Sequence, residues 1–405
     1  MSTDRHVIVG AGHAARRAAE TLRERDPNAR IVMLGEEPHA PYDRPVLSKD
    51  ALLVEGGEQR AFIRRPDWYA AHDIELRLAT TVESIDRARS EVRLHGGSPI
   101  GYDRLLLATG SRVRRFAGPV DHRVPLYYVR TLADSLALRS ALGSGKKVAI
   151  LGGGFIGLEV AASTTRAGCE ATVIEPAAAL LQRSLPPAAA HFVAALHARH
   201  GVTLRLDETP LSIGYENGRA LIETDRGTLE ADIVVVGIGV LPNVELAQEA
   251  GLQVDNGIVV DARCRTADPR IFAAGEVTMH FNPLLGRHVR IESWQVAENQ
   301  PAIAAANMLG VAQEYVEWPW LWSDQFDCNI QTLGTIDASH TLIARGDTHN
   351  GPFSLLALDA DRRLRAVVAI NSGRDMGACK RLVASGKVLD PALLADPAVG
   401  LRSLL

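Results

Sequence analysis

The hydrophobic pattern of the chain contains one unit twice. An apolar run at residues 6–10, His-Val-Ile-Val-Gly, ends in glycine, and so does a second run at residues 147–152, Lys-Val-Ala-Ile-Leu-Gly. Small residues and a stretch with helical spacing follow each run, which is the pattern of a βαβ unit. Further along, each copy has an acidic residue before an apolar run that ends in small residues, at 103–110 and at 232–239. The sequence therefore predicts two nucleotide-binding halves.

Two further regions lie outside this repeat. The apolar run at residues 271–275, Ile-Phe-Ala-Ala-Gly, has no βαβ unit of its own, so we expect this strand to return to the first domain. From about residue 316 the pattern changes to a tryptophan-rich segment. Alternating β-like runs follow at 353–358 and 365–370, before a basic, helix-like segment at 374–384.

These patterns predict an α/β fold with two Rossmann-like dinucleotide-binding domains and a smaller C-terminal α/β domain. We expect the first dinucleotide-binding domain to be discontinuous, at residues 1–110 and 240–315. The second is expected at residues 111–239 and the C-terminal domain at residues 316–405.

The first glycine-rich turn has the features of a dinucleotide site. Gly10, Gly12, Ala14 and Ala15 fit the pattern G-x-G-x-x-G/A between a strand and a helix, and Glu36 follows Gly12 by 24 residues. The glycines let the backbone approach a pyrophosphate, the helix N-terminus attracts its charge, and the carboxylate accepts hydrogen bonds from ribose hydroxyls. The alternative is a tight turn that serves only helix packing, and the strand, helix and acid together favour the dinucleotide site.

The second turn has the strict three-glycine form and predicts a second dinucleotide site. Its residues are Gly152, Gly153, Gly154, Phe155, Ile156 and Gly157. Glu175 follows Gly154 by 21 residues, and a carboxylate at that position favours the free 2′-hydroxyl of NADH over the phosphate of NADPH. Arg183 could accept a phosphate, but no basic residue directly follows Glu175. We therefore expect NADH at this site.

Composition excludes several other classes of protein. The formal charge of −4 over 405 residues argues against a general nucleic-acid binder, which needs a basic face. The longest strongly apolar stretch, at about 233–241, is far shorter than the roughly 20 residues of a membrane span. The N-terminus begins a strand pattern at once, without a signal peptide. We expect a cytoplasmic protein that binds neither nucleic acid nor membrane.

Two dinucleotide sites in one chain indicate a tightly held flavin, FAD, and an exchangeable nicotinamide, because hydride transfer needs both rings within about 3.5 Å. Disulfide reductases of this architecture have a redox-active cysteine pair, and related NADH oxidases and peroxidases have one active cysteine near the flavin. Here the four cysteines are widely spaced, at Cys169, Cys264, Cys328 and Cys379, and none lies in the first 168 residues. We therefore expect electrons to leave the flavin directly. Neither these cysteines nor the 13 histidines show the spacing of a metal site.

Several motifs together resemble one family. They are Arg-Pro-Val-Leu-Ser-Lys at 44–49, Ala-Thr-Gly at 108–110, Arg-Thr-Leu-Ala-Asp at 130–134, Gly-Gly-Gly-Phe-Ile-Gly-Leu-Glu at 152–159, Gly-Ile-Gly-Val-Leu-Pro-Asn at 237–243 and Trp-Leu-Trp-Ser-Asp-Gln at 320–325. The combination is similar to the oxygenase-coupled FAD-dependent NADH–ferredoxin reductases, such as putidaredoxin reductase and the reductases of biphenyl dioxygenases. Residues 275–280 and 290–295 look most similar to the reductase components of anthranilate 1,2-dioxygenase systems.

The resemblance implies a glutathione-reductase-like fold and a reaction cycle. NADH would transfer hydride to FAD, and single electrons would then pass to a transiently bound [2Fe–2S] ferredoxin that serves an aromatic ring-hydroxylating dioxygenase. Reductases for rubredoxin or for the ferredoxin of a cytochrome P450 have the same site chemistry and remain alternatives. A further alternative, of another class, is a flavin- and NADH-binding regulatory protein of the apoptosis-inducing-factor type.

The resemblance also implies which residues bind the cofactors. Those expected to line the FAD are Ala14, Glu36, Arg44, Lys49, Val82, Arg130 and Trp294, with Lys49 near flavin N5. Further cofactor contacts are expected from the strand-end residues Ala108, Thr109, Gly110, Gly237, Ile238, Gly239, Gly275 and Glu276, and from Trp320. Most relatives have Gly-Asp where this chain has Gly275-Glu276, a side chain one methylene longer, and FAD binding is still expected.

Lys49 and Glu159 are the candidate catalytic residues. A lysine in a proline-bounded turn is ordinarily a solvated surface residue, and an acid near a helix N-terminus is ordinarily a favourable charge there. The resemblance instead implies that Glu159 faces the nicotinamide and pairs with Lys49, which would stabilise the reduced, anionic flavin.

Tryptophans and arginines give weaker signals. Trp294 and Trp320 are expected to shield the flavin and border the partner surface, whereas Trp318 and Trp322 fit core packing equally well. Most basic clusters are ordinary solvated faces. The candidates for steering an acidic ferredoxin are Arg112, Arg114, Arg115, Arg374, Lys380 and Arg381.

Overall fold

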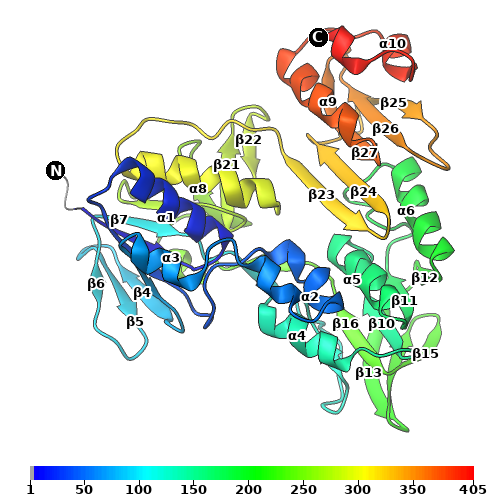
Figure 1. Ribbon diagram of the computed structural model, residues 1–405, viewed down its shortest axis with the longest axis horizontal. Coiled ribbons are helices and arrows are strands. Elements are labelled where there is room, and N and C mark those ends of the chain that lie inside the picture. Colours follow the sequence, from blue (N-terminus) through cyan, green and yellow to red (C-terminus); the bar gives the residue numbers. More distant parts are fainter. Residues whose placement is uncertain (1–3) are drawn as a thin grey trace. The chain divides into compact units, whose positions relative to one another are not determined.

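The computed structural model describes residues 4–405, whose contacts group them into two compact units (Figure 1). Unit 1 contains the described residues up to Arg44, then Gln59–Arg112 and Val240–Pro319. Unit 2 contains Pro45–Glu58, Val113–Gly239 and Trp320–Leu405. Among residues 4–405, no helix is both long enough and apolar enough to cross a membrane.

The core of unit 1 is a parallel five-stranded sheet in the order β20-β7-β1-β2-β3. The elements of this sheet and its helices are β1 (Arg5–Val9), α1 (His13–Arg25), β2 (Arg30–Leu34), α3 (Pro66–Ala71), β3 (Ile74–Arg77), β7 (Arg104–Leu107), β20 (Ile271–Ala273) and α8 (Trp294–Met308). Smaller elements of the unit are β4 (Val82–Asp86), β5 (Glu91–Leu94), β6 (Ile100–Gly101), β17 (Val240–Pro242), α7 (Glu245–Glu249), β18 (Val254–Asp255), β19 (Gly257–Val260), β21 (Thr278–Asn282) and β22 (Arg287–Val289).

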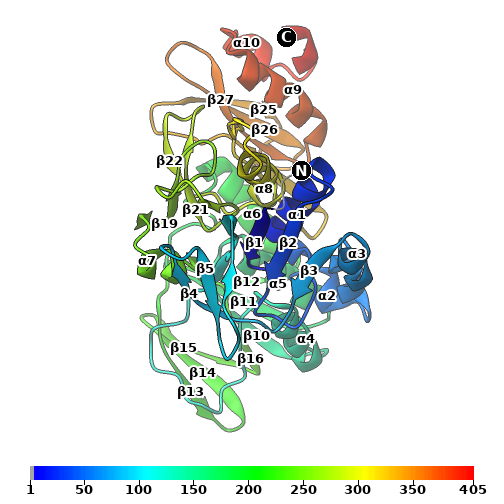
Figure 2. The same cartoon turned by 90° about the vertical axis from the view of Figure 1, so that its left-hand side faces the viewer.

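Both faces of this sheet are covered, because successive side chains of a strand point to opposite faces. Ile8 lies in a cluster with the α1 residue Leu22 and the α8 residue Met308. Its neighbours Val7 and Val9 lie in a second cluster on the other face. Helices α1 and α8 pack side by side, as both views show (Figures 1 and 2).

Unit 2 repeats this design with the parallel sheet β12-β11-β10-β16-β9. Its elements are α2 (Asp50–Leu53), β9 (Leu126–Tyr127), α4 (Leu132–Ala141), β10 (Lys147–Leu151), α5 (Phe155–Arg166), β11 (Glu170–Glu175), α6 (Pro187–Arg199), β12 (Thr203–Leu206) and β16 (Ile233–Val236). A three-stranded antiparallel sheet follows β12 in the chain, with β13 (Pro210–Glu216), β14 (Arg219–Thr224) and β15 (Gly227–Ala231). Three short elements lie where the chain passes between the units, η1 (Arg44–Val46), η2 (Gly57–Ala61) and β8 (Ser111–Val113).

The C-terminal part of unit 2 is an antiparallel sheet in the order β23-β24-β27-β26-β25. Its elements are β23 (Trp320–Gln325), β24 (Cys328–Leu333), β25 (Thr341–Gly346), β26 (Phe353–Leu358), β27 (Leu364–Ile370), α9 (Gly373–Ser385), α10 (Pro391–Ala395) and η3 (Leu401–Leu404).

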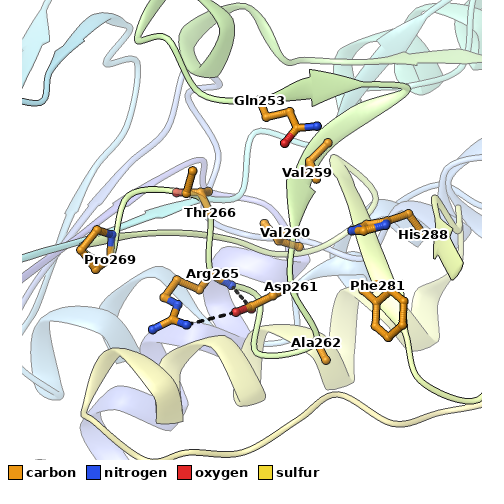
Figure 3. A pocket seen from close by; sticks show the side chains of 11 residues that line it. Gln253, Val259, Val260, Asp261, Ala262, Arg265, Thr266, Pro269, Phe281 and His288 are labelled. Carbon is orange, nitrogen blue, oxygen red and sulfur yellow. Dashed lines mark hydrogen bonds and ion pairs between the residues drawn. The ribbon is translucent and has the colours of Figure 1, made fainter. Parts of the chain in front are cut away.

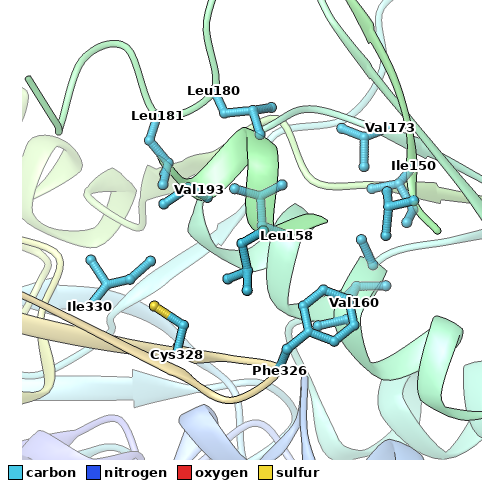
Figure 4. Close-up of a cluster of buried hydrophobic side chains, with 14 of the residues drawn as sticks. Ile150, Leu158, Val160, Val173, Leu180, Leu181, Val193, Phe326, Cys328 and Ile330 are labelled. Carbon is cyan, nitrogen blue, oxygen red and sulfur yellow. The ribbon is translucent and has the colours of Figure 1, made fainter. Parts of the chain in front are cut away.

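One hydrophobic cluster joins this sheet to the second Rossmann sheet (Figure 4). Leu158 of α5 and Ile150 of β10 share it with Phe326, Cys328 and Ile330 at the start of the C-terminal sheet. Unit 2 therefore contains both the second nucleotide-binding half and the C-terminal segment. The three-domain division at residues 110, 239 and 316 stays a prediction.

The α/β fold predicted from the pattern is confirmed, including the return of the 271–275 strand to the first sheet, where β20 pairs with β7. The alternation expected at residues 353–358 is wrong, since all six residues of β26 are buried. The shared cluster covers one face of the sheet at Phe353 and Leu355. Helix α9, which has no residue in that cluster, packs against β24 and β27.

The shared cluster makes a prediction about stability. Leu158 is fully buried in it, whereas Ile156 on the same helix is 46% exposed. Leu158→Ala should lower the free energy of unfolding by about 2–5 kcal/mol, because a cavity adds to the lost hydrophobic transfer. Ile156→Ala is the control and should cost much less. Urea unfolding followed by far-UV circular dichroism checks this, and equal shifts of the two midpoints would contradict the prediction.

Candidate functional site

The central strand of each parallel sheet lies at a topological switch point. β1 lies between β2 and β7, and β10 lies between β11 and β16, so the chain continues to one side of each central strand and later returns on the other. In such sheets, ligands bind outside the carboxyl ends of the strands at this point. Both glycine-rich turns, at residues 10–12 and 152–154, directly follow these central strands.

A close backbone approach explains the first glycine of each turn. Gly10 has a φ of +116°, and a Cβ atom there would lie 2.2 Å from the carbonyl oxygen of Ala108. Gly152 has a φ of +109°, and its Cβ would lie 2.5 Å from the carbonyl oxygen of Gly237. A side chain at Gly157 would meet the carbonyl oxygen of Gly152 at 2.1 Å, so α5 can begin against this turn only with glycine there.

The second glycine of the G-x-G motif in each turn faces open space instead. Gly12 and Gly154 are the N-cap residues of α1 and α5, and a Cβ at either would have no neighbour within 4 Å. No side chain among residues 4–405 caps either helix, and neither first turn contains an acid. Two helix N-termini without a side-chain cap and without an acid in the first turn fit the pyrophosphate of a dinucleotide. The residues of both turns therefore fit the groups that the sequence predicts.

The acid at the end of β2 is available to a ligand. Glu36 is exposed, and its side chain makes no hydrogen bond or ion pair within the described part of the chain. The adjacent Glu37 is occupied, since it accepts hydrogen bonds from Tyr42 at 2.5 Å and from Arg44 at 3.0 Å. Burial disfavours the charge of Arg44, but Tyr42, Glu37 and Glu276 outweigh it and raise the pKa of the guanidinium.

Glu175 accepts hydrogen bonds from two backbone N–H groups, one of which belongs to the second glycine turn. Its Oε2 accepts a hydrogen bond from the Gly153 N–H at 2.6 Å, and its Oε1 accepts one from the Ala177 N–H at 2.9 Å. An ionised carboxylate has about four acceptor positions, so capacity for ribose hydroxyls remains. Glu175 therefore fixes the turn and stands at the carboxyl end of β11, where a ribose is expected.

The other predicted residues of unit 1 also lie near strand ends or element starts. Val82 begins β4, and Trp294 begins α8. Ala108, Thr109 and Gly110 follow β7, and Thr109 donates a hydrogen bond to the carbonyl oxygen of Asn243 at 2.7 Å. Ala14 and Ala15 lie in the first turn of α1, and Gly275 and Glu276 follow β20. The carboxyl ends of β1, β2, β7 and β20 thus hold most of the predicted set.

Some predicted residues of unit 2 lie beside the glycine turn, and the others lie in separate segments of the unit. Gly237, Ile238 and Gly239 follow β16, beside the glycine turn after β10. Arg130 immediately precedes the capping box of α4, Trp320 stacks on Trp322, and Arg183 is exposed in the segment before α6. Phe155 and Ile156 begin α5. The structure does not test the cofactor contacts of these residues, so their roles stay predictions.

The structure brings Lys49 and Glu159 together. Lys49 Nζ lies 2.9 Å from Glu159 Oε1, and the glutamate side chain is 5% exposed while the lysine is 25% exposed. Both residues belong to unit 2, on the N-cap of α2 and in α5. The ammonium group is therefore held by a buried carboxylate. A catalytic role for the pair stays a prediction.

The sequence did not reveal a charged cluster around His13, the residue between the two halves of the first glycine motif. Its Nδ1 hydrogen-bonds Asp43, and its Nε2 lies 2.6 Å from Glu298 Oε2 on α8. Asp43 also accepts a hydrogen bond from the Trp294 indole at 3.2 Å, and Arg16 donates one to Glu298 at 2.5 Å. The partners are distant in sequence, so no local pattern marks them.

This cluster shifts the pKa values of its members. Burial favours neutral His13, but its hydrogen bonds to Asp43 and Glu298 outweigh burial and raise the pKa of the imidazole. Burial also opposes ionisation of Glu298, yet hydrogen bonds and charge from His13 and Arg16 lower its pKa to about 2. His13 therefore links α1, the segment at Asp43 and α8 through hydrogen bonds to two carboxylates.

The four cysteines are free and buried. Burial raises the pKa of Cys328 and of Cys379 to about 12 and raises that of Cys264 still further. A thiol held in its protonated form is a poor nucleophile. Within residues 4–405, no group of three or more histidine, cysteine or acidic side chains is arranged to hold a metal ion.

A surface pocket of about 590 Å³ lies elsewhere in unit 1 (Figure 3). Val259 and Val260 of β19, Phe281 and His288 line it together with an ion pair of Asp261 and Arg265. None of the residues predicted to bind a cofactor lines this pocket.

Comparison with known proteins decides the family. Residues 4–301 match the family of pyridine nucleotide-disulphide oxidoreductases, and residues 320–405 match the reductase C-terminal family. The chain belongs to the pyridine nucleotide-disulphide oxidoreductases. It is therefore an oxidoreductase, and the family implies the use of a flavin and of NAD(H).

Particular relatives match over the whole length. The chain is 61% identical to the anthranilate 1,2-dioxygenase system ferredoxin–NAD(+) reductase component of Burkholderia cepacia, covering 100% of both chains. The crystal structure of the covalent putidaredoxin reductase–putidaredoxin complex has a TM-score of 0.95 at 34% identity, with 100% of this chain and 98% of that chain covered. The ferredoxin reductase for the CYP199A2 system from Rhodopseudomonas palustris has a TM-score of 0.94 at 33% identity, with 99% of each chain covered.

The charged cluster makes a prediction about pH dependence. A raised pKa means that folded His13 holds its proton more tightly than the unfolded chain does. The resulting stabilisation is complete below about pH 6.5 and is lost as the pH rises through the folded pKa. His13→Gln should therefore lower the melting temperature by several degrees at about pH 6, from the loss of about 1–3 kcal/mol, and by less at about pH 9.

The matched control is His95→Gln, because His95 also faces a carboxylate, Glu83 at 2.5 Å, but its side chain is 79% exposed. A surface pair contributes about 0–1 kcal/mol, so this variant should change little at either pH. Thermal unfolding of the three purified proteins checks the prediction. A deficit of His13→Gln that is the same at both pH values would contradict it.

Proposed function

We propose that this oxidoreductase is an NADH:ferredoxin reductase that uses FAD and passes single electrons to a [2Fe–2S] ferredoxin, which serves an aromatic ring-hydroxylating dioxygenase. The observation that carries the proposal is the 61% identity over the whole length of a ferredoxin–NAD(+) reductase component. Two glycine turns at two switch points support it, since each has the position and backbone geometry that a dinucleotide site requires.

The FAD would be held by unit 1 through the residues that follow its parallel strands. The open N-terminus of α1 at Gly12 suits the pyrophosphate, and the unoccupied carboxylate of Glu36 suits ribose hydroxyls. Arg44 would contribute a fixed positive charge, because Glu37 and Tyr42 already orient its guanidinium. When bound, the flavin supplies the conversion of one hydride into two single electrons.

NADH would be held by unit 2. Gly154 offers the open N-terminus of α5 to the pyrophosphate, and Glu175 offers remaining acceptor positions to the adenosine ribose. The negative charge of Glu175 would oppose a 2′-phosphate, which favours NADH over NADPH. We infer that Lys49, oriented by Glu159, supplies the positive charge that stabilises the reduced flavin.

The electron acceptor would dock transiently through basic residues. The candidates Arg112, Arg114, Arg115, Arg374, Lys380 and Arg381 are all exposed, as such a role requires. Lys380 lies 3.9 Å from the centre of the Trp320 ring, which links the basic α9 to a residue expected near the flavin. Exposed charges of this kind raise the rate of encounter more than the affinity.

One alternative has a specific observation in its favour. A ferredoxin reductase for the CYP199A2 system has nearly the same fold over nearly the whole chain. The acceptor could therefore be the ferredoxin of a cytochrome P450 rather than that of a dioxygenase. The higher identity to the anthranilate dioxygenase component makes the dioxygenase ferredoxin the first choice.

A carrier assay tests the proposed function. With NADH and the FAD-loaded protein, a [2Fe–2S] ferredoxin from a ring-hydroxylating dioxygenase should be reduced at two molecules per NADH, since each accepts one electron. The rate should fall as ionic strength rises, because salt screens the basic residues. Ferredoxins of cytochrome P450 systems and rubredoxin, assayed at matched concentrations, should be reduced more slowly. Reduction of none of the carriers above the rate of free FAD would contradict the proposal.

The nucleotide preference makes a separate prediction. Glu175→Ala should raise the Michaelis constant for NADH by about tenfold and narrow the preference over NADPH, because one carboxylate serves both the glycine turn and the ribose. The matched control is Glu170→Ala, at the exposed opposite end of the same strand, and it should leave both constants near their original values. Steady-state kinetics with both nucleotides checks this. Equal efficiency of the unmodified protein with NADH and NADPH would refute the role of Glu175.

A further inference from the structure

Three side chains from two parts of unit 2, the segment of Ser48 and Lys49 and the strand of Ser323, meet at the carboxylate of Glu159. Ser48 donates a hydrogen bond to Oε2 at 2.5 Å, and Ser323 donates one to Oε1 at 2.6 Å. Lys49 Nζ also lies 2.9 Å from Oε1. Ser48 and Ser323 are each 1% exposed, so water does not replace their hydroxyls at the carboxylate.

The two serines offset the burial of a charge. A buried carboxylate costs several kcal/mol unless hydrogen bonds satisfy its oxygens. Glu159 is the fifth residue of α5, beyond the first turn, so the free backbone N–H groups of the helix do not reach it. Each of its oxygens instead has one hydroxyl donor, and only Oε1 has the ammonium group as well.

Gln325 fixes the direction in which the Ser323 hydroxyl donates its hydrogen bond. Gln325 Nε2 donates to Ser323 Oγ at 3.1 Å, which leaves the single hydroxyl proton of Ser323 for Glu159. The Gln325 Oε1 atom lies 2.9 Å from Nε2 of His197. Burial lowers the pKa of His197 to about 4, so its ring is neutral near pH 7 and donates its one proton to that oxygen.

Ser48 is fixed through its backbone. Ser163 of α5 donates a hydrogen bond to the Ser48 carbonyl oxygen at 2.6 Å, and Ser135 of α4 donates one to the Leu47 carbonyl oxygen at 2.7 Å. The segment that contains Lys49 is thus held against α5 and α4 immediately before the lysine. The Ser48 hydroxyl also donates a hydrogen bond to Glu159, the carboxylate that pairs with the ammonium group of Lys49.

We propose that Ser48 and Ser323 are positioning residues of the reaction centre, which hold the two oxygens of Glu159 so that its carboxylate fixes the ammonium group of Lys49. Through Ser323, the C-terminal sheet takes part in the chemistry of the second dinucleotide site. This inference rests on the proposed function for its kinetic consequence, whereas the hydrogen bonds to Glu159 do not depend on it.

The kinetic consequence is specific to Lys49. Without the Ser323 hydroxyl, Glu159 loses a donor on the oxygen that pairs with the lysine, and the ammonium group is oriented less well. Ser323→Ala should slow flavin reduction by NADH about tenfold, because misplacement of a stabilising group by a fraction of an ångström reduces the rate. Ser48→Ala should also slow flavin reduction by NADH.

A double-mutant cycle separates this role from a general structural one. Stopped-flow rate constants for flavin reduction by NADH are measured for the unmodified protein, Ser323→Ala, Lys49→Met and the double variant. If Ser323 acts through Lys49, Ser323→Ala should slow the reaction in the unmodified background and have almost no further effect beside Lys49→Met. Ser323→Cys, which keeps the side-chain volume without a strong donor, replaces the alanine variant if that variant folds poorly.

Thr224→Ala is the matched control, because it removes a buried hydroxyl hydrogen bond to another carboxylate of unit 2, that of Glu208, without touching Glu159 or the segment of Lys49. Its effect should be the same with and without Lys49. A Ser323→Ala variant that reacts at the unmodified rate, or that slows both backgrounds equally, would overturn the inference.

A second measurement does not depend on activity. The chain has only five lysines, so reductive ¹³C-methylation gives few NMR signals, and the signal of Lys49 is the one that Lys49→Met removes. Ser48→Ala and Ser323→Ala should move this signal, whereas Thr224→Ala should not. An unmoved signal in both serine variants would refute the positioning role. A moved signal in a protein that NADH does not reduce would uphold the contacts to Glu159 and refute the proposed function instead.

Discussion

The arrangement of both candidate dinucleotide sites depends on one constraint, a backbone contact that leaves no room for a side chain. At the ends of β1 and β10, the chain turns so closely against the neighbouring strand that a Cβ atom would lie within 2.5 Å of a carbonyl oxygen, at Ala108 or Gly237. The turn can therefore lead directly into a helix whose N-terminus is open. With a larger residue at Gly10 or Gly152, the helix would have to move away from the strand ends that hold the predicted ligand contacts.

Carboxylates that are buried, like Glu159, or partly buried, like Glu298, are the second organising feature, and each unit stabilises its carboxylate with donors from distant segments. In unit 1, His13 and Arg16 hold Glu298, which connects the first turn of α1 to α8. In unit 2, Ser48 and Ser323 hold Glu159, which connects α5 to the lysine segment and to β23. A buried carboxylate left without such donors would be strongly destabilising, so these groups specify which elements meet at each site.

The C-terminal sheet has a larger part in unit 2 than a separate domain would have. It shares a hydrophobic cluster with the Rossmann sheet, and it supplies the Ser323 hydroxyl to a residue of the glycine-turn helix. Side chains in a close-packed core transmit displacements, so a change in the C-terminal sheet would reach Glu159. This coupling gives the reductase C-terminal segment a physical link to the candidate catalytic pair.

The sequence by itself determined the features that depend on neighbours in the chain. Glycine spacing, apolar runs and the acids at Glu36 and Glu175 follow from local geometry, and they predicted both Rossmann sheets and the strand that returns as β20. The local sequence pattern did not predict contacts between residues that are far apart in the chain. Only the tertiary structure brought Ser48 and Ser323 to Glu159 and placed His13 against Glu298, because those partners are separated by 111, 164 and 285 residues. A hydrogen bond between such residues leaves no periodic trace in the sequence, since folding alone decides which distant donors reach a buried charge.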